Sequence, residues 1–224
     1  MIIKIKRQNG PETVAYWQSF EYNGTKHITV SAVLDALNYT DDLYDIKGKP
    51  AGRIRWECSC MQAVCGGCAM VINGVPALAC STYVDAFKTD ELVLEPLSKF
   101  PVVADLIVDR SVIYEQLIST KAFLDTVAVS DKRQHDHQYS VAKCLKCGLC
   151  LEVCPNYHPG GEFYGAVLAN ESYLVASQST EKKPQVVDAY KKHFGAGCSK
   201  ALSCQSVCPA GIETITSILK MNRK

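Results

Sequence analysis

The chain has 224 residues, and its 24 Lys and Arg nearly balance 23 Asp and Glu, which gives a formal net charge of +1. This length suffices for two modest domains, and the balanced charge argues against a general electrostatic attraction to nucleic acid or to anionic membranes. We expect no membrane-spanning helix, because no long apolar run occurs, and no secretory signal peptide, because no apolar core follows the first residues.

Twelve cysteines are the unusual feature of this composition. A reducing compartment disfavours structural disulfides, and a chain of this length does not need many of them to fold. The thiols are therefore interpreted as metal ligands.

The N-terminal part of the chain predicts a small α+β unit. Residues 3–6 alternate between apolar and charged side chains and residues 15–22 have a strand-like composition, so each segment predicts a strand. Apolar residues within 30–37 recur at helical spacing behind the possible caps Thr29 and Ser31, which predicts an amphipathic helix.

A hairpin is predicted where Asn73 and Gly74 separate two apolar runs, since both residues tolerate a positive φ. The hairpin would bring Cys80 back beside Cys68. Residues 92–94 predict one further strand of the same unit.

Three segments divide the chain: an expected α+β domain over 1–97, a connector over 98–139 and a helical domain over 140–224. Apolar residues at helical spacing predict a helix over 102–118. The polar segment 130–139 predicts an exposed link.

The C-terminal part alternates cysteine clusters with helical patterns, for example over 185–194. Pro209 is expected to open a last helix with one apolar face, formed by Ile212, Ile215 and Leu219.

The histidines do not have the spacing of Rieske ligands. We interpret His135 and His137 as solvated linker residues. His158 is expected to be an exposed loop residue, with a place facing a quinone as the alternative.

The first cysteine group has the spacing C-x4-C-x2-C with a fourth cysteine further on, which is typical of a plant-type ferredoxin and predicts a [2Fe-2S] cluster. Glycines 66 and 67 allow the backbone to approach the cluster closely. The predicted ligands are Cys60, Cys65, Cys68 and Cys80.

Two alternatives accompany this assignment. One is a zinc site or a group of buried free cysteines, although zinc usually takes paired C-x2-C knuckles. The other concerns Cys58, which lies outside the spacing and is expected to be a non-ligand near the cluster, with an exchange of roles with Cys60 left open.

The second cysteine group matches the bacterial ferredoxin run C-x2-C-x2-C-x3-C-P, whose fourth cysteine ligates the other cluster of a pair. It comprises Cys144, Cys147, Cys150 and Cys154. A third group repeats the run with Ala201 at the second cysteine position, and it comprises Cys198, Cys204 and Cys208.

If the two groups exchange their last cysteines, one site has four thiolates and the other has three. Cys144, Cys147, Cys150 and Cys208 then predict a [4Fe-4S] cluster. Cys154, Cys198 and Cys204 predict a [3Fe-4S] cluster, because the Ala201 methyl cannot bind iron. The alternatives for the three-thiolate site are a [4Fe-4S] cluster completed by water and a damaged site.

These three groups, in this order, resemble the iron-sulfur subunit of the succinate dehydrogenase and fumarate reductase family over nearly the whole chain. The segments ECSCMQAVCGGCAMVINGVPALAC and FPVVADLIVDRS carry the resemblance, together with the missing ligand at Ala201. It implies an α+β architecture, with a plant-type ferredoxin-like (β-grasp) domain followed by an all-α bacterial-ferredoxin-like domain.

The resemblance also implies a function in electron transfer. In that family a separate flavoprotein oxidises succinate or reduces fumarate at FAD, the [2Fe-2S] cluster faces the flavin, and the [3Fe-4S] cluster faces a quinone near a cytochrome b-like membrane-anchor subunit. The chain is therefore expected to be peripheral, on the cytoplasmic side of the membrane.

Departures from the family pattern concern the loop glycine and the quinone. Ala63 replaces a glycine common in the first loop, with an expected effect on local packing only. Members that use ubiquinone have a tryptophan and a histidine where this chain has Pro159 and Ser199, so menaquinone is expected. The alternatives are an electron-transfer subunit of a soluble flavoprotein reductase with a non-quinone partner, and a zinc-bound structural adaptor.

Overall fold

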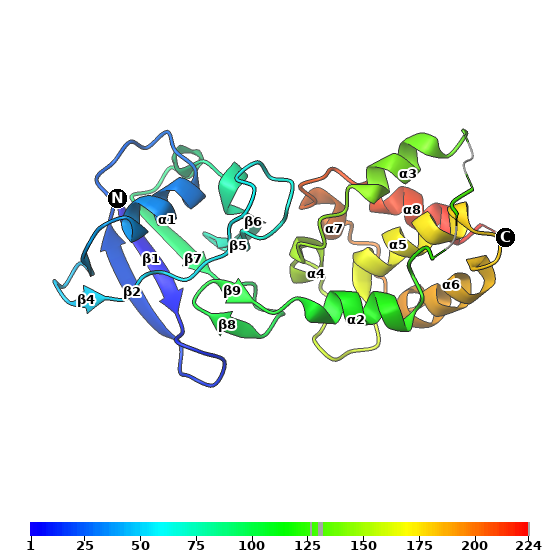
Figure 1. Cartoon of the computed structure of the whole chain (residues 1–224), viewed down its shortest axis with the longest axis horizontal. Helices are drawn as coiled ribbons and strands as arrows, with labels where there is room; N and C mark the ends of the chain where they lie inside the picture. Colours follow the sequence, from blue (N-terminus) through cyan, green and yellow to red (C-terminus); the bar gives the residue numbers. More distant parts are fainter. Residues whose placement is uncertain (126, 130–131, 224) are drawn as a thin grey trace. The chain divides into compact units, whose positions relative to one another are not determined.

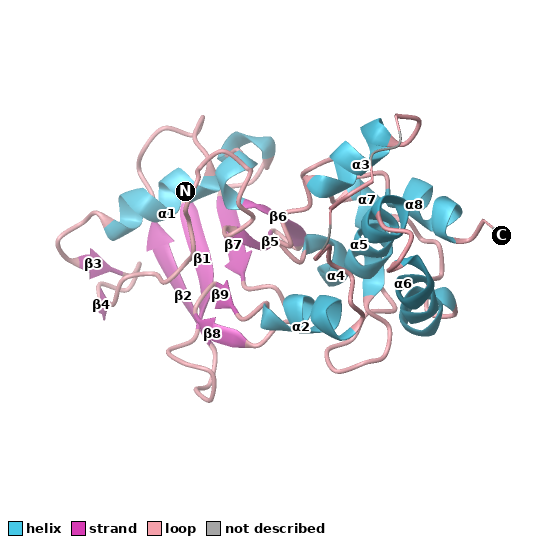
Figure 2. Ribbon diagram, turned by 45° about the vertical axis from the view of Figure 1, so that its right-hand side comes forward, coloured by secondary structure: helices cyan, strands magenta, loops and turns pink. Residues whose placement is uncertain are grey.

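The computed structural model describes residues 1–125, 127–129 and 132–223 (Figure 1). The chain divides into two compact units, Met1–Asp109 and Arg110–Lys224. The first combines a sheet with a helix, and the second is helical in the part of the chain that is described (Figure 2). This confirms the α+β class. The finer division into domains 1–97 and 140–224 with a connector between them stays a prediction.

A five-stranded sheet forms the centre of the first unit, in the order β2-β1-β7-β5-β6. Its strands are β1 (Ile2–Arg7), β2 (Tyr16–Glu21), β5 (Ala69–Ile72), β6 (Val75–Leu78) and β7 (Glu91–Glu95). β1 runs parallel to β7, whereas the other pairs are antiparallel. Two further strands, β3 (Leu43–Tyr44) and β4 (Pro50–Ala51), form a separate ribbon. The expected strands in the first unit are confirmed.

Helix α1 (Val30–Asn38) forms where the apolar spacing predicts it. The Thr29 hydroxyl accepts a hydrogen bond from the Ala32 N–H at 3.3 Å, as an N-cap does. Val33 and Leu34 on its apolar face are fully buried, so burial of this face stabilises the helix.

The hairpin that carries Cys80 is also confirmed. Asn73 and Gly74 have φ values of 47° and 78°, which place both in the left-handed region that a tight turn requires. After β6, the Ala79 N–H donates to the Cys68 carbonyl at 3.1 Å. The next residue, Cys80, is thereby held beside Cys68.

The helix predicted over 102–118 is wrong in its first half. This segment forms β8 (Val102–Ala104) and β9 (Ile107–Val108), and helix α2 (Ser111–Ser119) begins after them.

The reason for this difference is Asp105 in the turn between the two strands. Its buried carboxylate lies 3.0 Å from the Arg7 guanidinium and accepts the N–H groups of Gln8 and Arg55. A buried charge must be paired and hydrogen-bonded, so the turn that gives Asp105 these partners is favoured over a continuous helix.

The second unit is built around α5, most of whose residues are buried. Its described helices are α2 (Ser111–Ser119), α3 (His135–Ala142), α4 (Leu149–Glu152), α5 (Gly165–Gln178), α6 (Lys183–Tyr190), α7 (Ser203–Ser206) and α8 (Thr214–Met221). A π-helical turn, Lys191–Gly195, extends α6, which confirms the helical segment over 185–194. No described helix has the length and hydropathy needed to cross a bilayer.

Two expectations for the second unit need correction. The polar segment 130–139 is not a simple link, because helix α3 begins at His135; Ser130 and Asp131 lie outside the described residues. The last helix begins at Thr214 rather than at Pro209. Its buried side differs from the expected face, since Leu219 is exposed while Ile218, Ser217 and Met221 are buried.

Candidate iron-sulfur sites

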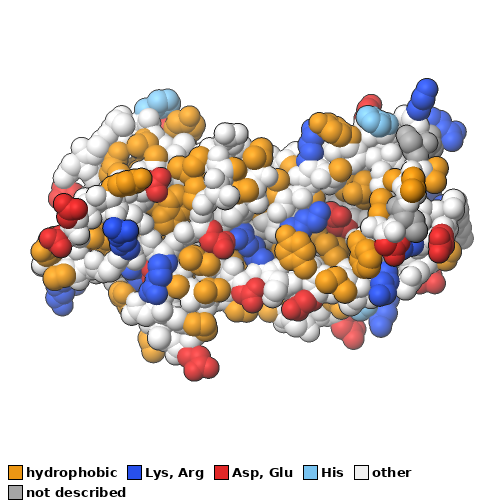
Figure 3. All heavy atoms as spheres, viewed as in Figure 1, with side chains coloured by type: hydrophobic (Ala, Val, Ile, Leu, Met, Phe, Trp, Pro, Cys, Tyr) orange, Lys and Arg blue, Asp and Glu red, His pale blue; other side chains and the backbone are white. Residues whose placement is uncertain are grey.

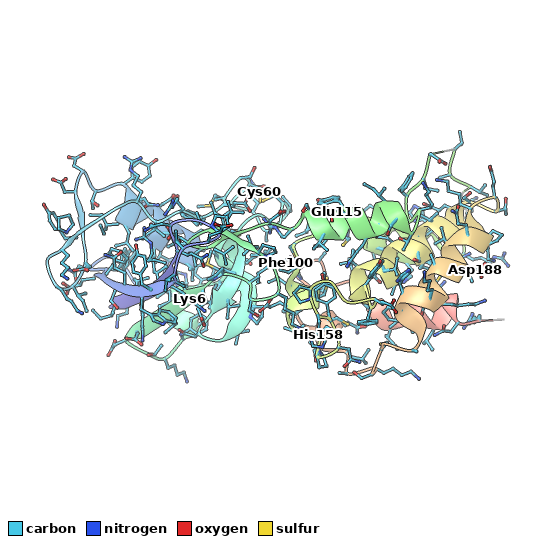
Figure 4. All side chains as sticks on the ribbon, turned by 90° about the horizontal axis from the view of Figure 1, so that it is seen from below. Lys6, Cys60, Phe100, Glu115, His158 and Asp188 are labelled. Atoms are coloured by element: carbon cyan, nitrogen blue, oxygen red, sulfur yellow. The ribbon has the colours of Figure 1, made fainter. Side chains whose placement is uncertain are left out.

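The first cysteine group lies in the loop before β5 and in the turn after β6 (Figure 4). The backbone N–H groups of Gln62 and Val64 donate to the Cys60 sulfur at 3.3 and 3.4 Å. The Ala63 N–H donates to the Cys80 sulfur at 3.3 Å. N–H donors directed at sulfur are what an anionic cluster requires from its surroundings, so this loop fits a [2Fe-2S] cluster.

The four thiols of this group differ in burial. Hydrogen bonds from Gln62, Val64 and Cys65 lower the pKa of Cys60 to about 6. Burial raises the pKa of Cys68 to about 12. The loop therefore has a solvent-facing side at Cys60 and Cys65 and a buried side at Cys68 and Cys80.

Left-handed backbone conformations give the loop its shape. Met61, Ala63 and Gly66 have φ values of 53°, 58° and 77°. Glycine adopts this region without a steric penalty, whereas the Cβ of alanine makes the same conformation unfavourable. The expectation that Ala63 affects local packing only is therefore wrong, because this residue also strains the backbone.

Cys58 occupies a different environment from Cys60. Its thiol, on an exposed residue, donates to the Met61 thioether at 2.8 Å, and partial desolvation raises its pKa. Cys60, by contrast, accepts two backbone hydrogen bonds. The contrast favours Cys60 as the ligand.

A cavity in the second unit gathers the cysteines predicted for the [4Fe-4S] cluster. Its lining includes Cys144, Cys147, Cys150, Cys208 and also Cys204. The first three come from the segment before and within α4, and Cys208 comes from the segment after α7, so two parts of the chain supply one set of thiols.

Burial raises the pKa of several thiols that line the cavity. Burial raises the pKa of Cys144 to about 11 and that of Cys150 well above its ordinary value. Cys144, Cys147, Cys204 and Cys208 add to the shift at Cys150, which shows that these sulfurs are close together. Iron stabilises thiolates that burial alone disfavours, so this donor set fits a cluster.

The remaining three thiols also lie near one another. Burial raises the pKa of Cys204, and Cys154 and Cys198 contribute to the same shift. The side-chain amide of Asn156 donates to the Gly197 carbonyl, which ties the segment after Cys154 to the segment before Cys198. This three-thiol set lies beside the cavity, because its member Cys204 also lines the cavity.

The two cysteine loops of the second unit have the same backbone conformation. Lys146 and Lys200 have φ values of 52° and 60°, and Gly148 and Leu202 have φ values of 87° and 58°. Each loop leads into a short helix, α4 or α7. Ala201 is exposed at the position where the first loop has the buried Cys147.

One feature of this region was not predicted from the sequence. Lys146 forms an ion pair with Glu171 of α5, at a distance of 2.6 Å. The only sequence signal was a lysine repeated directly before the second ligand position of both loops, in CLKC and CSKA.

The histidines have the following places. His135 is exposed and stacks on Tyr139, and the loop residue His158 is exposed (Figure 4). His137 differs from the expected solvated residue, since it is half-buried and its Nε2 lies 2.9 Å from the Ser217 hydroxyl. Among residues 1–125, 127–129 and 132–223, no group of three or more His, Cys, Asp or Glu side chains is arranged so that it could hold a single metal ion.

Two protein-family models match the chain. Residues 2–115 match the model described as a 2Fe-2S iron-sulfur cluster binding domain. Residues 140–212 match the model described as a 4Fe-4S dicluster domain. The two matches cover the three cysteine groups.

Relatives of known identity match nearly the full length. The succinate dehydrogenase iron-sulfur subunit of Bacillus subtilis is 30% identical, over 98% of this chain and 90% of that protein. The fumarate reductase iron-sulfur subunit of Escherichia coli O6:H1 is 30% identical, over 96% of this chain and 89% of that protein.

A solved structure has the same fold. One chain of the Mycobacterium smegmatis Sdh1 complex in its apo form superposes with a TM-score of 0.73 and 21% identity, over 98% of this chain and 94% of that chain. With two family models and two near-full-length relatives in agreement, the chain belongs to the family of iron-sulfur electron-transfer subunits of succinate dehydrogenase and fumarate reductase.

Proposed function

We propose that this chain relays electrons between the FAD of a flavoprotein subunit and a quinone, through a [2Fe-2S], a [4Fe-4S] and a [3Fe-4S] cluster. The proposed ligand sets are Cys60, Cys65, Cys68 and Cys80 for the first cluster, Cys144, Cys147, Cys150 and Cys208 for the second, and Cys154, Cys198 and Cys204 for the third. When bound, these clusters supply one-electron redox centres.

The observation that carries the proposal is the cavity lined by Cys144, Cys147, Cys150 and Cys208. A cysteine from the end of one ferredoxin run joins three from the other run, which is the exchange expected of two neighbouring clusters. Because Cys204 borders the same cavity, the second and third clusters would be adjacent, as electron transfer in series requires.

The third site supports a cluster with one iron fewer. Ala201 occupies the position that corresponds to the ligand Cys147 in the repeated backbone, and its methyl group cannot coordinate iron. Ala201, Ser199 and Pro159 are exposed, so this end of the unit is open to a partner. We propose menaquinone as the acceptor or donor there, since Pro159 and Ser199 replace the residues of ubiquinone-using members.

The partners follow from the family. We propose a flavoprotein subunit and a cytochrome b-like membrane anchor, with this chain peripheral on the cytoplasmic side of the membrane. A soluble flavoprotein reductase with a non-quinone partner would use the same ligand sets and is the outcome against which the proposal is tested.

The experiment is purification of the native complex, with iron and acid-labile sulfide analysis and EPR spectroscopy. The three sets predict about nine irons and three distinct signals. Copurification of a flavoprotein and a haem-containing anchor, with quinone-dependent turnover, would support the proposal. Six irons or fewer, bound zinc without visible absorption, or a complex without an anchor would contradict it.

A further inference from the structure

A buried ion pair lies next to the proposed [4Fe-4S] site. Lys146, between the ligands Cys144 and Cys147, places its ammonium 2.6 Å from the carboxylate of Glu171. Their side chains are only 20% and 10% exposed. Charges in such surroundings are screened much less than surface charges.

Both members of the pair lie next to a proposed cluster ligand, Cys144. The Lys146 ammonium donates to the Cys144 carbonyl at 3.4 Å. The Glu171 carboxylate lies near the Cys144 thiol, and its negative charge contributes to the raised pKa of that thiol. The pair thus touches the backbone of one ligand and places a carboxylate near its sulfur.

The pair separates the cysteine cavity from an apolar hollow. Lys146 lines the cavity, and Lys146 and Glu171 line the hollow, where hydrophobic side chains surround them. Those side chains include Tyr114, Leu117, Ile118, Phe123, Leu174 and Val175. Hydrophobic side chains are visible around α2 in Figure 3. Apart from Lys146 and Glu171, the described residues that line this hollow include no charged side chain that would offset the pair.

A purely structural role does not account for this arrangement. A buried ion pair contributes little net stability, because its desolvation penalty offsets the attraction. A Cys144 thiolate bound to iron carries negative charge, so the Glu171 carboxylate would then lie near a negatively charged sulfur. Lys146 is the cation placed to compensate for that repulsion.

We propose that the Lys146–Glu171 ion pair sets the reduction potential of the cluster held by Cys144, with Glu171 lowering the potential and Lys146 raising it. The inference rests on the proposed ligand set. Reduction adds negative charge to the cluster, so a nearby carboxylate opposes it and a nearby ammonium favours it. Neither residue touches the reacting centre, and both act through electrostatics.

The test is an EPR-monitored redox titration of the [4Fe-4S] signal in the purified complex, with the Glu171→Gln variant. Glutamine keeps the shape of the side chain and one acceptor oxygen for Lys146, but it removes the charge and replaces the second oxygen with an NH2 group. The midpoint should rise by enough to change the reduced-to-oxidised ratio at a fixed potential at least tenfold, which is about 59 mV for one electron.

Lys146→Gln should shift the midpoint in the opposite direction, and Lys146→Arg should restore the wild-type value. Lys143→Gln is the matched control, since Lys143 is adjacent to Cys144 but exposed, with its ammonium 4.4 Å from the Tyr139 ring. We expect this variant to leave the midpoint unchanged, because solvent screens the charge.

The outcomes separate this inference from the proposed function. The inference would be overturned if the [4Fe-4S] signal stays intact and the reduction midpoints of Glu171→Gln and Lys146→Gln equal that of Lys143→Gln. If Glu171→Gln fails to assemble a cluster, Lys146→Gln and Lys146→Arg provide the test. Equal midpoints in these two variants would overturn the inference. A wild-type complex without any reduced four-iron signal would instead contradict the proposed function.

Discussion

The two cysteine loops of the helical unit have similar backbone conformations but different side chains. Both have a lysine with positive φ before the second ligand position, a second left-handed residue after it, and a short helix that follows. The first loop has Cys147 and Gly148 in the middle, whereas the second has Ala201 and Leu202. The loop conformation therefore does not depend on the second thiol.

The loops also differ in burial. Helix α4 buries Leu149 and Leu151, whereas α7 buries none of its four residues. The first loop lies against the interior of the unit and the second faces outward. This contrast supports the proposal that the inner site relays electrons and the outer site exchanges them with a partner, and it makes Ala201 the position at which the proposed cluster type can be tested.

The largest expected effect comes from making the loops alike with Ala201→Cys. The matching backbone should place the new thiol at the vacant corner of the cluster, so that [3Fe-4S] becomes [4Fe-4S]. We expect almost complete loss of the oxidised three-iron EPR signal and a new signal at low potential. Quinone turnover should fall, while flavin-dependent reduction of artificial acceptors persists.

Ser199→Cys is the control for this experiment. It adds an exposed thiol to the same loop at a position that does not correspond to a ligand. The three-iron signal should therefore survive. A wild-type protein that shows no three-iron signal when isolated without oxidative damage would refute the assignment of the third cluster.

The reverse change, Cys147→Ala, should give the first loop the ligand pattern of the second. Cys147 is buried and lines the cysteine cavity, so its loss leaves three thiolates for the inner cluster. We expect the reduced [4Fe-4S] signal to disappear and the oxidised three-iron signal to increase. An unchanged four-iron signal would show that Cys147 is not a ligand.

A smaller effect tests whether the contrast between a ligand and a neighbouring non-ligand extends to the first unit. Cys65→Ser should abolish or reshape the reduced [2Fe-2S] signal, because it removes a thiolate at ferredoxin spacing. Cys58→Ser should preserve the signal, since the Cys58 thiol donates a hydrogen bond to the Met61 thioether and is not among the proposed ligands. Equal loss in both variants, measured by EPR, would make Cys58 a ligand.

Local patterns predicted much of this molecule. Thr29 and the apolar face behind it specified α1, and Asn73-Gly74 specified the hairpin, because caps and tight turns depend on neighbouring residues. The cysteine spacing likewise indicated which thiols belong together, since a loop around a cluster has a limited length.

Long-range contacts were the part that sequence patterns did not contain. Asp105 pairs with Arg7 from a distant strand and forces a turn where helical spacing suggested a helix. Glu171 meets Lys146 only because α5 packs against the cysteine loop. Such pairs depend on the tertiary arrangement, which periodicity within one segment does not report.

The smallest expected effect concerns backbone strain, at residues with similar left-handed conformations in the two units. Ala63 has φ of 58° and Gly148 has φ of 87°. An L-residue in this region costs about 1–2 kcal/mol relative to its usual conformation. Ala63→Gly should therefore stabilise the first loop by about 1 kcal/mol, reduced somewhat by the greater entropy of glycine in the unfolded chain.

Gly148→Ala introduces the same strain that Ala63→Gly removes, so it should destabilise its loop by about 1–2 kcal/mol. The measurement is the denaturant midpoint at which each cluster's EPR signal is lost, compared with wild type. The midpoint should rise for the [2Fe-2S] signal in Ala63→Gly and fall for the [4Fe-4S] signal in Gly148→Ala. Shifts of the same sign would show that side-chain packing, and not the left-handed backbone, governs the stability of these loops.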